Sequence, residues 1–327
     1  MRLLFSFVLA VLLGAAGAGY LWLDQPFALS APTADLSIEP GASGRDIASA
    51  VQDAGVSVNS DLLYAWFRFS GQSKKIKAGS YELDHQTTPR SLLQKLVRGE
   101  EALRSVTLVE GWTFRQVREV LAKAEQLKPD SRALTTEDIM NQLGKSGTPP
   151  EGRFFPDTYT YSKGSSDLAV LRRAMRAMDK RLTATWALRD PGSPLRSPED
   201  ALVLASIIEK ETGAPQDRSN IAAVFSNRLR IGMRLQTDPS VIYGMGAAFD
   251  GNLRKRDLQT DTPWNTYTRV GLPPTPIAMP GKAALLAAVQ PATSKALYFV
   301  ARGDGSSQFS ASLDEHNRAV NKYQRGQ

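Results

Sequence analysis

The sequence predicts an α+β protein with an N-terminal membrane anchor, a small α+β subdomain and a larger, mixed, mainly helical domain with short strands. Three observations support this prediction: an uncharged apolar run at the N-terminus, short strands that alternate with helices in the first third, and helical periods that dominate the rest. A length of 327 residues is enough for two or three domains. A content of 42% hydrophobic and 22% charged residues is typical of a folded chain.

Residues 1–24 form the predicted transmembrane anchor. Leu3–Leu23 is a stretch of 21 residues without a charge, which is long enough to cross a hydrocarbon core as a helix. Tyr20 and Trp22 stand where an interfacial aromatic belt is expected. With Arg2 on the cytoplasmic side, the chain becomes a single-pass protein of the cell inner (cytoplasmic) membrane, with its bulk outside the cytoplasm.

A cleaved signal peptide is the alternative, with residues 3–13 as its apolar region and Ala16-Gly17-Ala18 as its cleavage site. The apolar run continues for five residues past that site, which favours the uncleaved anchor. Both interpretations place the remaining chain outside the cytoplasm. Residues 25–34 contain two prolines and small side chains, and they are interpreted as a linker.

Residues 35–105 are predicted to form the small subdomain. A strand at 35–39 is followed by a helix with Ile47, Ala48 and Val51 inward, a second helix capped at 59–60, and a strand at 78–83. Another helix begins at Thr88-Pro89. This strand–helix–helix–strand order resembles a LysM module, which is a small carbohydrate-binding fold. A spacer domain without a ligand is the alternative.

Residues 106–327 are assigned to the larger domain, with a strand at 102–109 leading into it and helices at 113–124 and 167–186. The segment Glu151-Gly-Arg-Phe-Phe-Pro-Asp-Thr-Tyr-Thr-Tyr161 gathers aromatic side chains and two acids. Such mixtures occur in sugar-binding clefts, because aromatic faces stack on sugar rings and carboxylates accept from hydroxyls. Glu151 is therefore a candidate binding residue, and a core role for the aromatics is the alternative.

The helix predicted for Ser197–Gly213 places two glutamates next to a run of apolar residues. Ser197 is a suitable N-cap, Pro198 suits the first turn, Asp200 stands at the capping-box position, and Gly213 is the predicted stop. Glu211 continues the apolar stripe of residues 204, 207 and 208, whereas Glu209 follows a more mixed face.

Glu211 is thus the better candidate for a general acid. Burial on an apolar stripe raises the pKa of a carboxyl group, and the negative end of the helix dipole acts in the same direction. Both effects favour the protonated form near neutral pH, as a general acid requires. The alternative is a frayed helix end with two solvated glutamates.

The C-terminal third offers further polar candidates. A helix at 220–230 contains Asn227, and a turn follows in which Gln236 and Thr237 could face a ligand and Asp238 is explained as an N-cap before Pro239. Residues 262–268 form a polar and aromatic surface loop. The remaining chain is predicted as a proline-rich loop, a helix at 281–289, a hairpin around 303–307 and a final helix at 313–323.

Several classes of chemistry lack support. There are no cysteines, the histidines His85 and His316 belong to no ligand-spaced cluster, and no nucleotide-binding glycine pattern occurs, so neither a metal nor a cofactor is predicted. The net charge of +7 suits an anionic partner, but no run of basic residues indicates nucleic acid. Carboxylate acid–base chemistry with one outstanding acid remains.

Three motifs carry a resemblance to a known family: LASIIEKET, VFSNRLRIGMRLQTDPSVIYGMG and TPWNTYTRVGLPPTPIAMPG. In this order they resemble the endolytic murein transglycosylases of the YceG-like (MltG) family, from about residue 151 to the end. The resemblance implies that Glu211 is catalytic. It also implies a group of substrate-binding cleft residues: Asn227, Gln236, Asp238, Tyr243, Asn265 and Tyr267. Trp264 departs from the family, which usually has a tyrosine there.

The activity implied by the resemblance is lytic cleavage of the MurNAc–GlcNAc bond within nascent peptidoglycan strands. It forms 1,6-anhydro-MurNAc ends without consuming water and terminates glycan elongation. The implied partners are peptidoglycan glycan strands and peptidoglycan synthases. Two alternatives remain at this point: a hydrolytic muramidase or glucosaminidase, and a non-catalytic wall-binding adaptor.

Overall fold

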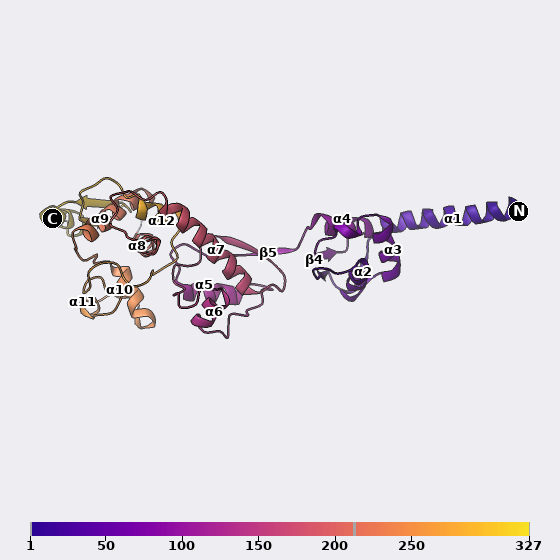
Figure 1. Cartoon of the computed structure of the whole chain (residues 1–327), viewed down its shortest axis with the longest axis horizontal. Coiled ribbons are helices and arrows are strands. Elements are labelled where there is room, and N and C mark those ends of the chain that lie inside the picture. Colours follow the sequence, from indigo (N-terminus) through magenta and orange to yellow (C-terminus); the bar gives the residue numbers. More distant parts are fainter. Residues whose placement is uncertain (1, 212–213, 327) are drawn as a thin grey trace. The chain divides into compact units, whose positions relative to one another are not determined.

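The computed structural model describes residues 2–211 and 214–326 and divides the chain into two compact units (Figure 1). The first unit contains the chain up to Arg104 together with Thr160–Gly164. The second contains Ser105–Tyr159 and the chain from Ser165 onward. Each unit has its own hydrophobic core.

The described part of the first unit contains the helices α1 to α4 and two short antiparallel strand pairs. Its elements in chain order are α1 (Arg2–Leu23), β1 (Ala28–Leu29), β2 (Thr33–Ile38), α2 (Gly44–Asp53), β3 (Val56–Ser57), α3 (Ser60–Phe69), β4 (Gly79–Asp84) and α4 (Pro89–Arg98). β2 pairs with β4, and β1 pairs with β3. The predicted strand, two helices and second strand are present in this order, with the short unpredicted strand β3 between the helices, and the LysM-like interpretation stays a prediction.

Local sequence explains these elements. Ser43 and Asp46 form a reciprocal capping box that starts α2, and the Asn59 side chain accepts from Leu62 N–H at the start of α3. In β2 every second residue is buried, so one face of the two-stranded sheet packs on the helices. Leu63 and Phe67 of α3 are fully buried in the same core.

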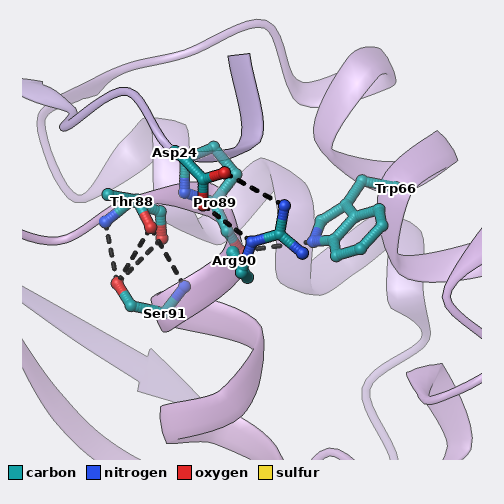
Figure 2. A network of polar contacts seen from close by, with 6 residues as sticks. All are labelled: Asp24, Trp66, Thr88, Pro89, Arg90 and Ser91. Atoms are coloured by element: carbon teal, nitrogen blue, oxygen red, sulfur yellow. Dashed lines mark hydrogen bonds and ion pairs between the residues drawn. The ribbon is translucent and has the colours of Figure 1, made fainter. Parts of the chain in front are cut away.

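The end of α1 is joined to the start of α4 by a small polar network (Figure 2). The Arg90 guanidinium donates to both carboxylate oxygens of Asp24, at 2.7 and 3.1 Å, and also lies over the Tyr20 ring. Trp66 Nε1 donates to the Pro89 carbonyl, which ties α3 to the same corner. These contacts hold the C-terminal end of α1 against the small domain.

The membrane anchor is a separate question. Among the residues whose side chains the structure describes, no helix combines the length and the apolarity needed to cross a membrane. The anchor at residues 1–24 stays a prediction.

The second unit is mainly helical, as predicted, with short strands. Its helices are α5 (Phe114–Lys123), α6 (Thr136–Gln142), α7 (Asp167–Trp186), α8 (Pro198–Glu211), α9 (Arg218–Arg230), α10 (Asp238–Met245), α11 (Lys255–Gln259), α12 (Lys282–Val289) and α13 (Leu313–Gln324). β7 (Tyr298–Ala301) and β8 (Ser307–Ser310) form the predicted hairpin. β5 (Leu103–Thr107), which corresponds to the strand predicted at 102–109, pairs with β6 (Thr158–Ser162), a strand that was not predicted. Each of these two strands has residues in both units.

The core of this unit surrounds α8, which packs against α7, α9, α10 and α12 (Figure 1). Ser206 is the only polar residue in the middle of α8, and it is fully buried. Its hydroxyl donates to the Val203 carbonyl at 2.7 Å and accepts from Ile277 N–H at 3.0 Å. The proline-rich loop is thereby fixed to the helix that carries the candidate acid.

The aromatic cluster at 151–161 is mostly a core feature. Phe154, Phe155 and Tyr161 are buried, and Phe154 stacks on Phe114 with ring centroids 5.1 Å apart. Glu151 is different, because its buried carboxyl group lines a pocket.

Candidate active site

The start of α8 follows the predicted capping with one change. Ser197 Oγ accepts from Asp200 N–H at 3.1 Å, as a cap requires. The Asp200 carboxylate, however, accepts from Arg196 N–H at 2.8 Å. The helix runs to Glu211. The predicted stop, Gly213, lies outside the described residues.

The faces of α8 do not by themselves separate its two C-terminal glutamates. Every residue from 201 to 208 is buried, so the residues that share a helix face with Glu209 are as buried as those that share a face with Glu211. The mixed face that the sequence assigned to Glu209 is therefore buried as well, in a helix that contacts α7, α9, α10 and α12. The two glutamates differ instead in the groups that their carboxylates contact.

Glu209 has a structural partner. Its Oε2 accepts from Gly281 N–H at 2.8 Å, and Gly281 is the N-cap residue of α12. A carboxylate at this position satisfies a helix N–H group that would otherwise lack an acceptor. Burial raises the pKa of Glu209, and the Gly281 N–H partly offsets this. Glu209 therefore supports the packing of α12 on α8.

Glu211 faces polar groups instead. Its Oε1 accepts from the Thr237 hydroxyl at 2.5 Å. Burial is the main cause that raises the pKa of Glu211, and the nearby Asp238 charge adds to it, while Thr237 and Arg228 act in the opposite direction. The raised pKa confirms the direction inferred from the sequence.

Thr237 is itself held by a buried set of hydroxyl groups. It is 1% exposed, and its N–H donates to Thr266 Oγ1 at 3.0 Å. Ser240 Oγ lies 2.8 Å from Thr266 Oγ1 and donates to the Thr237 carbonyl. These bonds fix the Thr237 backbone, and the Thr237 hydroxyl in turn orients the Glu211 carboxyl group before any substrate binds.

An open pocket of about 770 Å³ lies in front of Glu211. Gln236, Asp238 and Tyr267 line it, and the Tyr267 hydroxyl donates to Asp238 Oδ1 at 2.6 Å. Burial, followed by Asp238, raises the pKa of Tyr267, so its hydroxyl stays a donor. The structure thus brings four of the predicted site residues into one pocket.

Two of these residues, Gln236 and Asp238, have a backbone conformation or helix position that was not predicted. Gln236 has φ 52°, a left-handed conformation that costs a non-glycine residue about 1–3 kcal/mol and is often found at functional sites. Asp238 is the first residue of α10, whose N-cap is Thr237. The prediction that Asp238 caps this helix is therefore wrong, because its carboxylate accepts from Tyr267 instead.

Arg228 also lines the pocket and was not selected from the sequence. It is 8% exposed, and its guanidinium donates to the carbonyls of Leu297, Leu235 and Arg234 and lies over the Tyr298 ring. Its position seven residues after Ile221 was a usable signal, since this places Arg228 on the inward stripe of α9.

Two predicted cleft residues instead hold the scaffold together. The Asn265 side chain is fully buried, and its amide donates to the carbonyls of residues 257, 258 and 260. Its oxygen accepts from Tyr267 N–H, so Asn265 positions Tyr267 rather than lining the pocket. The Asn227 amide donates to the carbonyls of Ser294 and Ala296, just before β7.

The last two predicted residues, Glu151 and Tyr243, meet in a different pocket. The Tyr243 hydroxyl donates to Glu151 Oε2 at 3.2 Å, and Phe114 N–H donates to Oε1 at 3.0 Å. Burial raises the pKa of Glu151 to about 7 in spite of these donors. Glu151 therefore does not share the Glu211 pocket.

This buried acid gives a stability prediction. Because the folded protein binds the Glu151 proton more tightly than the unfolded chain, its contribution is complete below about pH 4.5 and is lost as the pH rises through about 7. Glu151→Gln should remove about 3 kcal/mol of this pH dependence, measured by urea unfolding between pH 4.5 and 8. The exposed Glu119→Gln should leave the slope unchanged, and an equal slope in both variants would contradict the assignment.

In the described part of the chain, no group of three or more histidine, cysteine, aspartate or glutamate side chains is arranged to hold a metal ion. The Glu211 pocket combines one buried acid of raised pKa with amide, hydroxyl and carboxylate groups. This arrangement has the groups that acid–base catalysis requires.

Comparison with known proteins gives the family. A model of the YceG-like family matches residues 36–322. The chain is 33% identical to the endolytic murein transglycosylase of Bacillus subtilis over 90% of this chain and 86% of the relative. It is 27% identical to the enzyme of that name from Streptococcus pneumoniae, covering 96% of this chain and 64% of the relative.

A solved structure agrees with this assignment. The crystal structure of a putative YceG-like protein from Listeria monocytogenes is 30% identical, with a TM-score of 0.55 over 88% of this chain and 98% of that one. This chain belongs to the YceG-like family.

Proposed function

We propose that this chain is a peptidoglycan lytic transglycosylase that cleaves the MurNAc–GlcNAc bond inside glycan strands. The observation that carries the proposal is the single acid of raised pKa, Glu211, oriented by Thr237 in an open polar pocket. The relatives named endolytic murein transglycosylase support the same substrate class.

One carboxyl group is sufficient for this reaction. Glu211 gives its proton to the glycosidic oxygen as the bond from MurNAc C1 to that oxygen breaks. The resulting carboxylate then takes the proton of the MurNAc C6 hydroxyl, and O6 bonds to C1. The products are a 1,6-anhydro-MurNAc end and a new GlcNAc hydroxyl end; no water is consumed, and Glu211 is protonated again.

The surrounding groups have distinct tasks in this proposal. With Oε1 held by the Thr237 hydroxyl, Oε2 is the oxygen assigned the transferable proton. The Gln236 amide and the Tyr267 hydroxyl are placed to hold sugar hydroxyl and acetamido groups. The Arg228 cation favours the carboxylate form that exists between the two proton transfers.

The test is the chemistry of the new strand ends. Purified glycan strands treated with the protein should yield fragments with anhydro ends in mass spectrometry, whereas a hydrolase adds one water per cut and leaves reducing ends. Strands that remain intact but are bound tightly would favour the wall-binding adaptor. Either of these outcomes contradicts the proposal.

The hydrolase alternative has one supporting observation, since Asp238 is a second carboxylate in the Glu211 pocket. A hydrolase would need it as base or nucleophile. Under the transglycosylase proposal, Asp238 raises the pKa of Glu211 and accepts from the Tyr267 hydroxyl, but it transfers no proton.

Asp238→Asn separates the two mechanisms. The variant should still form anhydro ends, but the fall of kcat/KM on the alkaline side should move to lower pH, because removing the negative charge lowers the pKa of Glu211. Tyr267→Phe, which keeps the Asp238 charge, should not move the profile in that direction. Complete loss of cleavage in Asp238→Asn would favour the hydrolase.

We further propose that residues 1–24 anchor the chain in the inner membrane, with the rest of the chain outside the cytoplasm. We also propose that cleavage of nascent glycan strands at this membrane, beside the peptidoglycan synthases, terminates their elongation. The uncharged run Leu3–Leu23 supports this proposal. The full chain should resist carbonate extraction from membranes and retain its N-terminal mass. A soluble mature protein that begins after Ala18 would instead identify a signal peptide.

A further inference from the structure

Helix α3 of the first unit carries a row of apolar side chains on its outer surface. At 3.6 residues per turn, an arc of about 100° contains Leu62, Ala65, Trp66 and Phe69, which we call the α3 stripe. Leu62 is 47% exposed, and Phe69, at 86%, is the most exposed large hydrophobic side chain that the structure describes. Neither residue belongs to the hydrophobic core of the unit, which α3 contacts through another face. Apolar side chains gathered on one exposed face indicate an interaction surface.

The α3 stripe borders the corner at which α1 ends. Trp66 Nε1 donates to the Pro89 carbonyl at 3.2 Å, and the next residue, Arg90, binds the Asp24 carboxylate. Asp24 directly follows α1, and the Arg90 guanidinium also lies over the Tyr20 ring of that helix. Figure 2 shows the Arg90 side chain between Asp24 and Trp66. In Figure 1, α3 lies at the end of the first unit from which α1 leaves.

The anchor proposed for residues 1–24 indicates what this surface meets. In that proposal Tyr20 and Asp24 lie where α1 leaves the hydrocarbon core, and the headgroup layer extends about 5–8 Å beyond the core. The stripe is reached from Asp24 through the Arg90 side chain and the adjoining Pro89 carbonyl, so it lies close to this layer. Residues 25–104 contain equal numbers of acidic and basic side chains, so the attraction to the membrane is apolar rather than electrostatic.

We propose that the α3 stripe lies in the interfacial layer of the membrane that holds α1, so that the first unit rests on the lipid surface. The proposal rests on the proposed anchor. A few apolar side chains bind a membrane only weakly by themselves, but the attachment through α1 keeps them at a high effective concentration beside it. The contact restricts rotation of the first unit about the end of α1.

Site-directed spin labelling of the full chain in lipid vesicles provides the test. The chain contains no cysteine, so a label attaches only at an introduced one. Its accessibility is measured to oxygen, which concentrates in lipid, and to a nickel complex, which stays in water. Leu62→Cys places the label in the stripe. Glu100→Cys is the matched control, because Glu100 is exposed and follows the far end of α4, about 14 Å along the helix axis from Pro89.

The ratio of oxygen to nickel accessibility should be several times higher at position 62 than at position 100. Adding Phe69→Gln to the chain labelled at 62 should lower the ratio towards that at 100. This variant should fold, because the Phe69 side chain is largely exposed. Leu103→Gln, at another exposed apolar residue of the first unit, should leave the ratio unchanged.

A third label, at Leu13→Cys within α1, separates this proposal from the anchor on which it rests. A lipid-exposed label at 13 together with equal ratios at 62 and 100 would overturn the proposal and keep the anchor. A water-exposed label at 13 would overturn both. A label at 62 that is shielded from both reagents and shows spin–spin broadening would assign the stripe to a second copy of the chain, which also overturns the proposal.

Discussion

Glu211→Gln should lower the rate of strand cleavage by about 10²–10⁴ or more, with no new product. The amide keeps the shape of the carboxyl group and can still accept from the Thr237 hydroxyl, but it cannot deliver a proton to the glycosidic oxygen. Because the proposed mechanism uses the same group again as the base, both proton transfers are lost together. Release of anhydro ends from purified strands, followed with time by mass spectrometry, measures the effect.

The matched control is Glu209→Gln, which changes the same residue type two positions earlier on α8. Its amide oxygen can still accept from Gly281 N–H, so we expect nearly wild-type cleavage and a small loss of stability. The thermal midpoint of Glu211→Gln should not fall, since a buried carboxyl group of raised pKa is replaced by a neutral one. Equal cleavage by Glu211→Gln and the wild type would show that another group is the acid.

Arg228→Met should have the largest effect on stability, a loss of about 3 kcal/mol or more. Methionine retains much of the apolar stem, but it leaves the carbonyls of Leu235 and Leu297, each now 2.7 Å from a guanidinium nitrogen, without a donor. Leaving a buried polar group unpaired costs about 1–3 kcal/mol each. For a unit of this size, the thermal midpoint should fall by about 10 °C.

Arg230→Met is the control for this variant, because Arg230 belongs to the same helix and is exposed. Its contacts with Asn227 and Gly192 lie at the surface, so the expected loss is below about 1 kcal/mol. A second measurement uses the pH profile of cleavage. Removing the Arg228 cation should raise the pKa of Glu211 and move the alkaline fall to higher pH, opposite to Asp238→Asn. Similar midpoints for the two arginine variants would contradict the structural role assigned to Arg228.

Periodicity and capping were enough to predict most of the helices. The helix at 167–186 has the predicted bounds, and Asn59 and Thr88 cap the helices that their sequences indicated. These features are local, since a cap joins a side chain to an N–H group only two or three residues away. β6 and α11 were missed because a short strand or a single helical turn carries too few residues to display a period.

The choice of Glu211 came from the sequence for a reason that is only partly correct. Its burial and raised pKa agree with the inference, but its neighbour Glu209 is also half-buried with a raised pKa. Only the tertiary structure shows that one carboxylate meets a helix N-terminus and the other a pocket. The motif resemblance likewise grouped Asn227 and Asn265 with the cleft, whereas their amides bind backbone carbonyls.

The sequence by itself determined the helical scaffold and the family motifs, because these depend on neighbours along the chain. The tertiary structure decided which polar groups meet. Thr237 reaches Glu211 across 26 residues, and Tyr243 reaches Glu151 across 92. Such pairs depend on how α8, α10 and the loops pack together, and no local pattern encodes that packing. The division of the predicted cleft into two pockets therefore became visible only in the folded chain.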